Sequence, residues 1–262
     1  MLRVIERTCK MDNYKGFATM YDELMTNVPY DKWGTYICDV LEKQNFVEKH
    51  PIVLDLACGT GTMTVLLAEK GYDMIGVDAS VDMLASAQQK AYEKNFQILF
   101  LCQDMRNLDL FGTIDAAICV CDGLNYILEQ DELQKVFERV RLFLNSGGVF
   151  IFDMNTEYKF KELLGNRSFE GEAESGSSYE MDNKYDEITK INEYHVVFYE
   201  NDAKSHFSET HTQRAYDTGS IIQMLHDAGF NDVAVNHDYS TKPPKPDSPR
   251  LTFVAKVRTC VQ

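Results

Sequence analysis

The chain has 262 residues, of which 44% are hydrophobic and 26% are charged. This length and composition predict one globular unit with room for an inserted subdomain. The net charge is −15, from 41 acidic and 26 basic residues, which argues against DNA or RNA as a partner because a phosphate backbone would be repelled.

No apolar run approaches the ~20 residues that a membrane-spanning helix needs, so we expect no membrane partner. The first residues also lack the apolar core of a secretory signal. The seven cysteines are odd in number and form no CxxC pair. We therefore expect free buried thiols, no disulfide framework, no metal site and a cytoplasmic location.

Residues 1–50 carry many aromatic side chains around a helical segment. Because this segment precedes the first predicted strand, we expect it to lie at the edge or mouth of the sheet as a lid. Tyr21 is a candidate catalytic residue that closes the pocket and directs its hydroxyl at the reacting groups. Trp33 is a candidate for flanking a bound cofactor, although core packing is the more common role of such a ring.

Residues 51–155 alternate between strand and helix patterns. Nearly continuous apolar strands between helices predict a parallel sheet covered on both faces. In such a sheet, ligands bind outside the carboxyl ends of the strands, at the switch point. The apolar runs expected to form strands occupy residues 51–57, 72–78, 96–104, 114–122 and 149–155.

A polar stretch with β-like alternation and turn signals runs from about residue 167 to 216. We predict three long antiparallel strands there, forming a meander inserted into the α/β unit. A helix ending at Gly229 and two closing strands follow. The expected organisation is a lid at 1–50, a core at 51–155 and 217–262, and an inserted β subdomain at 156–216.

The stretch VLDLACGTGTMT, residues 53–64, joins a strand to a glycine-rich turn. Gly59 and Gly61 allow a tight bend and a close approach of a ligand. A dinucleotide fingerprint would need glycine where Thr64 stands, and no G-K-[ST] follows as in a phosphate-binding P-loop. Asp55, at the end of the strand, would repel phosphate and favours a ligand with positive charge and no phosphates, such as S-adenosylmethionine (SAM).

Two more acids follow the next two strands. Asp78 could accept hydrogen bonds from both hydroxyls of a ribose, in SAM as in NAD. Asp104 could accept one from the amino group of adenine, although capping its own loop is the alternative. Acids after three successive strands favour SAM, with the neighbouring Ala79, Met83 and Met105 as candidates for enclosing the adenosine.

The ordered set VLDLACGTG, GVDAS, QDM, CVCDGLNYI and LNSGGVFIFD resembles the class I SAM-dependent methyltransferases over about residues 50–155. Their first motif is an acid followed by glycines at alternate positions, matched by Asp55, Ala57, Gly59 and Gly61, with Ala57 in place of the first glycine. The resemblance implies an α/β fold, a Rossmann-like seven-stranded methyltransferase sheet with helices on both faces and an inserted antiparallel β-meander.

The wider layout is similar to a subgroup that acts on small amines. It includes glycine N-methyltransferase-like enzymes and the N-methyltransferases of antibiotic amino sugars. These carry an aromatic "Y-D" lid segment, matched by Tyr21 and Asp22, and an insertion after strand five. The resemblance implies SAM as cofactor and S-adenosylhomocysteine as product.

The segment after the fourth strand, CDGLNYI, carries acceptor-facing groups in this family. It lacks the [ND]-P-P-[YF] sequence of adenine and glutamine-amide methyltransferases, and Cys121 lacks the context of a cytosine-attacking cysteine. We expect Cys121 to line the SAM pocket through its backbone. Asn125 and Tyr126 are candidates for contacting the acceptor or the methionine moiety, with packing at a helix start as an equal alternative.

Alternation along HTQRAY places His211 on one face of a strand and Arg214 and Tyr216 on the other. His211 is the candidate general base. Arg214 could bind a carboxylate or phosphate of the acceptor, and Tyr216 could orient it. Both faces cannot point into the cleft without a bulge, so the two assignments compete.

The sequence predicts a SAM-dependent methyltransferase that acts on a small-molecule acceptor, with an amine favoured, as a monomer or homodimer. Two alternatives stay open. A non-catalytic SAM-binding module could keep the same core without chemistry. A nicotinamide-dependent oxidoreductase would need glycine at position 64 and would tolerate Asp55 poorly.

Overall fold

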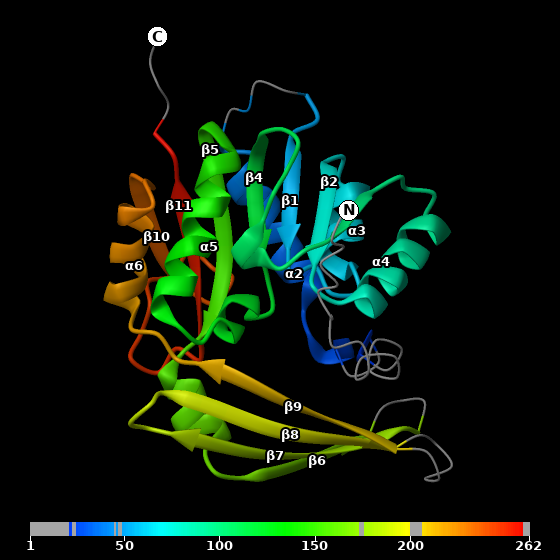
Figure 1. Ribbon diagram of the computed structural model, residues 1–262, viewed down its shortest axis with the longest axis vertical. Helices are drawn as coiled ribbons and strands as arrows, with labels where there is room; N and C mark the ends of the chain where they lie inside the picture. Colours follow the sequence, from blue (N-terminus) through cyan, green and yellow to red (C-terminus); the bar gives the residue numbers. More distant parts are fainter. Residues whose placement is uncertain are drawn as a thin grey trace, which may run out of the picture.

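The computed structural model describes residues 21–22, 25–44, 46, 49–172, 176–199 and 206–258 (Figure 1). The chain forms a seven-stranded sheet with helices on both faces and a separate four-stranded antiparallel sheet, drawn below it in Figure 1. The predicted architecture is therefore confirmed. Within these ranges, no helix combines the length and the apolar character that a bilayer crossing requires.

The large sheet has the order β10-β11-β5-β4-β1-β2-β3. Chain order runs outward from β1 to β3, then returns to the other side of β1 with β4, so the switch point lies between β1 and β4. The two last strands pair antiparallel, and the first five run parallel. The strands are β1 (Ile52–Leu56), β2 (Asp73–Asp78), β3 (Leu99–Cys102), β4 (Ile114–Cys119), β5 (Leu144–Asn155), β10 (Asp232–His237) and β11 (Arg250–Lys256).

Helices cover both faces of this sheet. On one face lie α5 (Gln130–Phe143) and α6 (Thr218–Asp227), whose apolar stripes join a core cluster with β4 and β5. On the other face lie α2 (Tyr30–Leu41) and α3 (Thr62–Glu69). The helix α4 (Val81–Glu93) begins at Ser80, whose hydroxyl accepts the Met83 N–H at 3.2 Å, the N-cap that its sequence predicts.

The inserted sheet has four strands, so the prediction of three was wrong. The missed strand is β6 (Ser168–Glu172), which is short and contains Gly171. A Cβ on Gly171 would lie 2.6 Å from the Tyr179 ring, so the glycine makes room for an aromatic neighbour. The other strands are β7 (Ser178–Asp186), β8 (Ile191–Tyr199) and β9 (His206–Arg214), and the π-helix η4 (Lys159–Leu164) leads into them.

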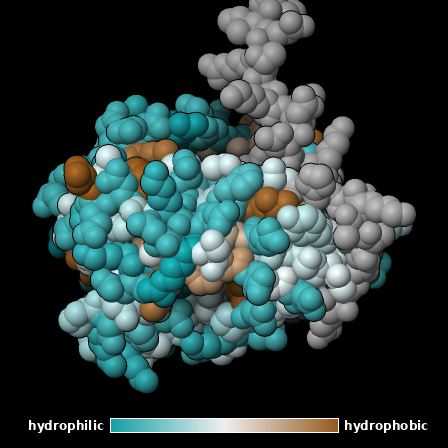
Figure 2. Space-filling model, turned by 90° about the horizontal axis from the view of Figure 1, so that it is seen from below, coloured by the Kyte–Doolittle hydropathy of each residue, from teal (hydrophilic) through white to brown (hydrophobic). Residues whose placement is uncertain are grey.

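The predicted lid is described only in part, because residues 1–20 lie outside the described ranges. The helix α2 packs Trp33, Tyr36, Ile37 and Leu41 against the sheet. Three short 3₁₀ helices stand around the mouth of the sheet: η1 (Met25–Asn27), η2 (Met105–Asn107) and η3 (Gly123–Tyr126). Figure 2, seen from below, shows a mostly hydrophilic surface with scattered hydrophobic groups, as the acidic composition predicts.

Candidate active site

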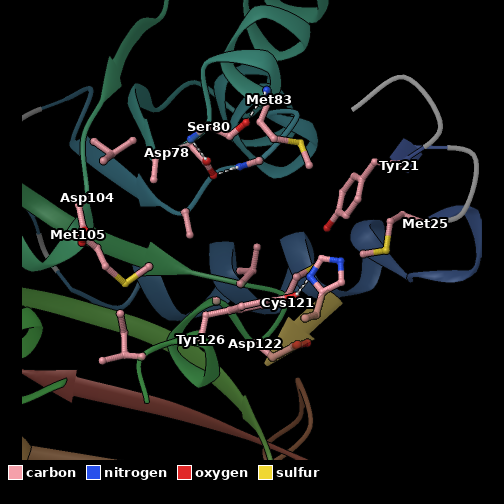
Figure 3. Close-up of a pocket in the computed structure, with 18 of the residues that line it drawn as sticks. Tyr21, Met25, Asp78, Ser80, Met83, Asp104, Met105, Cys121, Asp122 and Tyr126 are labelled. Atoms are coloured by element: carbon pink, nitrogen blue, oxygen red, sulfur yellow. Dashed lines mark hydrogen bonds between the residues drawn. The ribbon is translucent and has the colours of Figure 1, made fainter. Parts of the chain in front are cut away.

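A cavity of about 1180 Å³ lies between the carboxyl ends of the core strands and the inserted sheet (Figure 3). One wall comes from the loops after β1, β2, β3 and β4. The opposite wall comes from β7, β8 and β9 and includes Tyr179, Met181, Tyr194, Val196, Phe198 and His211. The cavity thus stands at the edge of the sheet where the topology predicts a ligand.

The turn after β1 uses left-handed backbone three times. The φ angle is +58° at Ala57, +54° at Gly59 and +75° at Gly61. Ala57 and Gly59 line the cavity. Gly61 does not, but a Cβ there would lie 2.8 Å from the Cβ of Ala87, so this glycine lets α3 approach α4.

Asp55 lies beneath this turn rather than in the cavity wall. It is fully buried, and its Oδ2 accepts a hydrogen bond from the Thr64 hydroxyl at 2.5 Å. Burial raises the pKa of Asp55 to about 7, the Thr64 hydrogen bond opposes the rise, and the charge of Asp78 adds to it. We expected Asp55 to approach a cationic ligand directly. The structure differs, because the side chain points into α3 and anchors its first turn.

Asp78 does line the cavity, as does its neighbour Ala79. The Asp78 carboxylate accepts the N–H of Gly59 and the N–H of Ser80, each at 2.8 Å. Burial raises the pKa of Asp78, while these backbone donors lower it. Met83 stands close by in Figure 3 and also packs against the inserted sheet.

Asp104 caps the short helix η2. It accepts the Arg106 N–H at 2.9 Å and forms an ion pair with the Arg106 guanidinium, which also reaches Glu132 at 2.7 Å. The hydrogen bond from Arg106 lowers the pKa of Asp104. The capping alternative therefore describes the side chain, which lines the cavity together with Met105.

The segment after β4 bends sharply, with φ angles of +58° at Cys121 and +52° at Asp122. Both residues line the cavity. The Cys121 thiol donates to the Tyr30 hydroxyl at 3.5 Å, and burial raises the pKa of Cys121 to about 11. The thiol is thus kept protonated, in keeping with the expectation that Cys121 acts through its backbone.

The next two predicted residues have different placements. Asn125 is buried and does not line the cavity. Its amide donates to the carbonyls of Asn155 and Arg214 and accepts the Asn155 N–H, so it fastens η3 to β5 and β9. Tyr126 does line the cavity, and its hydroxyl contacts the Tyr194 hydroxyl at 2.8 Å and His211 Nδ1 at 3.1 Å.

Only one face of β9 enters the cavity, as alternation requires, and it is the face of His211. Arg214 and Tyr216 are not among the lining residues. The Arg214 guanidinium donates to the Leu128 carbonyl, and the Tyr216 hydroxyl donates to the Ile127 carbonyl at 2.7 Å. These two side chains thus hold the loop after η3, which differs from the acceptor contact expected of them.

The two candidate residues of the lid region, Tyr21 and Trp33, have different placements. Tyr21 points its hydroxyl into the cavity in Figure 3. Burial raises the pKa of Tyr21 well above the usual value, and the charges of Cys121 and Asp122 add to the rise. Trp33 reaches the cavity wall but is buried, and it stacks on Tyr239 with ring centroids 4.5 Å apart. Core packing therefore accounts for most of its contacts.

Residues 53–148 match the protein family described as Methyltransferase domain. The candidate methyltransferase YqeM of Bacillus subtilis is 36% identical over 245 residues, covering 93% of this chain and 96% of that protein. A SAM-dependent methyltransferase from Clostridium acetobutylicum ATCC 824 has a crystal structure with 33% identity and a TM-score of 0.84, covering 94% of this chain and 99% of that one. The chain belongs to the SAM-dependent methyltransferases.

A glycine/sarcosine N-methyltransferase of Halorhodospira halochloris is 28% identical to this methyltransferase over 141 residues, which is 53% of this chain and 51% of that protein. The cofactor of the family is SAM. These relatives favour neither a nicotinamide-dependent oxidoreductase nor a non-catalytic binding module.

The core end of the cavity fits SAM. Each Asp78 oxygen has one hydrogen bond from the turns, which leaves acceptor capacity for hydroxyl groups. Apolar side chains from Val77, Ala79 and Met105 line the same end. The basic side chains in the described lining are already engaged: Arg106 and Arg250 each pair with two carboxylates, and Lys159 donates to the Asn155 amide oxygen. The wall therefore suits a ligand without phosphates.

A buried charge cluster in this methyltransferase was missed by sequence reasoning. The Arg250 guanidinium contacts Asp122 at 3.0 Å, forms a second ion pair with Asp153 and lies over the Trp33 ring. Burial alone would raise the pKa of Asp122, but Arg250 is the main group that holds it below its usual value. The sequence offers little signal, because Asp122 and Arg250 are 128 positions apart.

Proposed function

We propose that this methyltransferase transfers a methyl group to the nitrogen of a small amine. The observation that carries the proposal is the composition of the cavity next to the inserted sheet. Tyr21, Tyr126 and Tyr194 stand there, and their aromatic faces suit an ammonium group. The carboxylate of Asp122, paired with Arg250, lines the same end. The likeness to a glycine/sarcosine N-methyltransferase supports the same acceptor class.

We assign the core end of the cavity to SAM, which supplies a methyl group activated on a sulfonium. Asp78 would bind the ribose hydroxyls and Asp104 the adenine amino group. Asp55 and Gly61 support this end from beneath, and Trp33 supports it from the side. The residues in contact with the cofactor would be Ala57, Gly59, Asp78, Ala79, Met83, Asp104, Met105 and Cys121.

The protein's own contribution is orientation, exclusion of water and control of one proton. An ammonium group has no lone pair, so the acceptor must lose a proton before it can react. Met181, Val196 and Phe198 of the inserted sheet give the acceptor end an apolar wall that excludes water. Tyr21 lines the same cavity, and His211, also in its wall, is the candidate base.

The dimensions and the charge suit a small acceptor. The cavity volume of about 1180 Å³ exceeds the ~300–1,000 Å³ of a single-ligand pocket, which leaves room for SAM and one more small molecule. The net charge of −15 disfavours a nucleic-acid substrate. We place the enzyme in the cytoplasm, as a monomer or homodimer.

The test is a transfer assay with SAM that carries a deuterated methyl group. The protein is incubated with four amines (glycine, sarcosine, phenethylamine and glucosamine) and with two phenols of similar size, p-cresol and 4-ethylphenol. Mass spectrometry then detects the labelled product. We expect label on at least one amine nitrogen and a strong loss of label with the Asp78→Asn variant. Label on the phenols alone would overturn the amine proposal.

A further inference from the structure

A chain of polar side chains leads from the cavity into the inserted sheet. Tyr126 on η3 faces the cavity, His211 on β9 stands behind it, and Glu209 on β9 stands behind His211. We propose that these three residues form a proton relay for the acceptor amine. The Tyr126 oxygen receives the proton, His211 takes the tyrosine proton, and Glu209 is a positioning residue. The inference rests on the amine acceptor proposed above.

Glu209 is the member of the relay whose surroundings give the strongest support for it. Its Oε2 lies 3.2 Å from His211 Nε2, and its side chain is almost fully buried. Neither carboxylate oxygen has a hydrogen bond from a described group, and the imidazole nitrogen at 3.2 Å is the polar group beside them. Its cross-strand neighbour, Val196 on β8, is buried and apolar. Since a buried carboxylate is costly without a partner, the imidazole is the group that compensates it.

This contact sets the direction of the proposed relay. A carboxylate beside Nε2 stabilises the tautomer that carries the N–H on that nitrogen, which leaves the Nδ1 lone pair facing Tyr126. The Tyr126 hydroxyl, 3.1 Å away, then donates to Nδ1. The Tyr194 ring stacks on the imidazole with centroids 4.7 Å apart and planes 13° apart, so the ring orientation is held from a second side.

Tyr126, rather than His211, reaches the acceptor. Both residues line the cavity, and Tyr126 is 41% exposed overall, whereas His211 is 9% exposed. Burial raises the pKa of Tyr126 well above its usual value, and the charges of Tyr194, Asp122 and Tyr21 add to the rise. The hydroxyl therefore keeps its proton at neutral pH, so it can accept a proton only by passing its own to His211.

The proton step balances within the site. The N–H bond of the ammonium group breaks, and its proton bonds to the Tyr126 oxygen while the Tyr126 O–H proton moves to His211 Nδ1. The products are a neutral amine and an imidazolium beside the Glu209 carboxylate. The amine lone pair is then available as a nucleophile.

The first test measures kcat/KM against pH, with the best amine of the transfer assay. Tyr126→Phe removes the relay oxygen, and Tyr199→Phe removes an exposed hydroxyl of the same sheet as a matched control. We expect a loss of about 10²-fold for Tyr126→Phe near pH 7.5, with a rate that rises tenfold per pH unit up to the amine's own pKa. For Glu209→Gln we expect a smaller loss of kcat/KM, with the same pH dependence as Tyr126→Phe. Profiles parallel to wild type would overturn the relay.

The second test needs no acceptor. Protein labelled with ¹⁵N-histidine reports the tautomer of each ring by NMR, and His211→Asn identifies the His211 signals. We expect the Nε2–H tautomer in wild type and a mixture in Glu209→Gln. The Nδ1–H tautomer in wild type would overturn the relay, whether or not an amine is methylated. A failure to methylate any amine would refute the amine acceptor separately. Unchanged binding of S-adenosylhomocysteine shows that each variant is folded.

Discussion

The carboxylate of Asp78 accepts the backbone N–H of Gly59 at 2.8 Å, which ties the end of β2 to the turn after β1. A second oxygen of the same carboxylate accepts the N–H of Ser80, at the start of α4. One side chain thus sets the spacing of two loops that line the cavity. The carboxylate therefore shapes the cofactor end of the cavity, in addition to any contact that it makes with SAM.

The substitution Asp78→Asn tests this dependence. An amide has one acceptor oxygen, so its NH₂ group would face one of the two backbone N–H donors. Hydrogen bonds to a charged group are worth about 1.5–3 kcal/mol, so we expect affinity for S-adenosylhomocysteine to fall by about 10–100-fold. Isothermal titration measures it. Asp73→Asn, at the exposed opposite end of β2, is the control, and equal affinity for all three proteins would contradict the assignment.

Asp55→Asn tests the buried carboxyl group by its effect on stability. The folded-state pKa of Asp55 is about 7, above the ~3.9 of an unfolded chain, so its contribution to stability is complete below about pH 4. That contribution is lost as the pH rises through about 7, and amounts to about 4 kcal/mol at most. The variant keeps an acceptor for Thr64 and should lose less stability between about pH 5 and 8. Urea denaturation measures the free energy of unfolding of both proteins. If it changed with pH by the same amount in the variant and in the wild type across this range, the prediction would be refuted.

Ala57 holds a left-handed conformation, with φ of +58°, that glycine adopts more easily. Relief of a strain of about 1–2 kcal/mol outweighs the extra entropy that glycine loses, so Ala57→Gly should raise stability by about 0.5–1 kcal/mol. Ala68→Gly, inside α3, is the matched control and should lower stability by about 1 kcal/mol. Calorimetry gives both values. A loss at position 57 would mean that the methyl group packs more tightly than the strain costs.

Arg250→Met removes the cation between Asp122 and Asp153. The buried Asp153 and the largely buried Asp122 then lack their shared partner, so we expect a loss of about 3–5 kcal/mol in the free energy of unfolding. Arg258→Met, at an exposed position just after β11, should change stability little. Chemical denaturation measures both variants, and similar small effects would show that the buried ion pairs contribute nothing net.

The sequence predicts well what depends on local pattern. The turn after β1 and the acid at the end of β2 are readable because strand, turn and helix follow within a few residues. Alternation in β9 also predicts that His211 and Arg214 face opposite ways. Only the fold reveals which face is inward, since that depends on how the inserted sheet packs over the core.

Residues that meet across long separations escape a local reading. Arg250 and Asp122 come from opposite ends of the core, and no motif links the two residues. Glu209 lies in a polar strand, where an acid looks solvated, and its burial depends on the sheet around it. Asp55 shows the converse, because its motif position is evident but its direction into α3 is not.

The most direct test of the central claim is a crystal structure with S-adenosylhomocysteine bound. We expect the ribose at Asp78, the adenine beside Met105 and the sulfur directed toward Tyr126 and Tyr21. That arrangement would leave the end next to the inserted sheet for an amine. A sulfur directed away from Tyr126, or a ligand outside this cavity, would contradict the division into a cofactor end and an acceptor end.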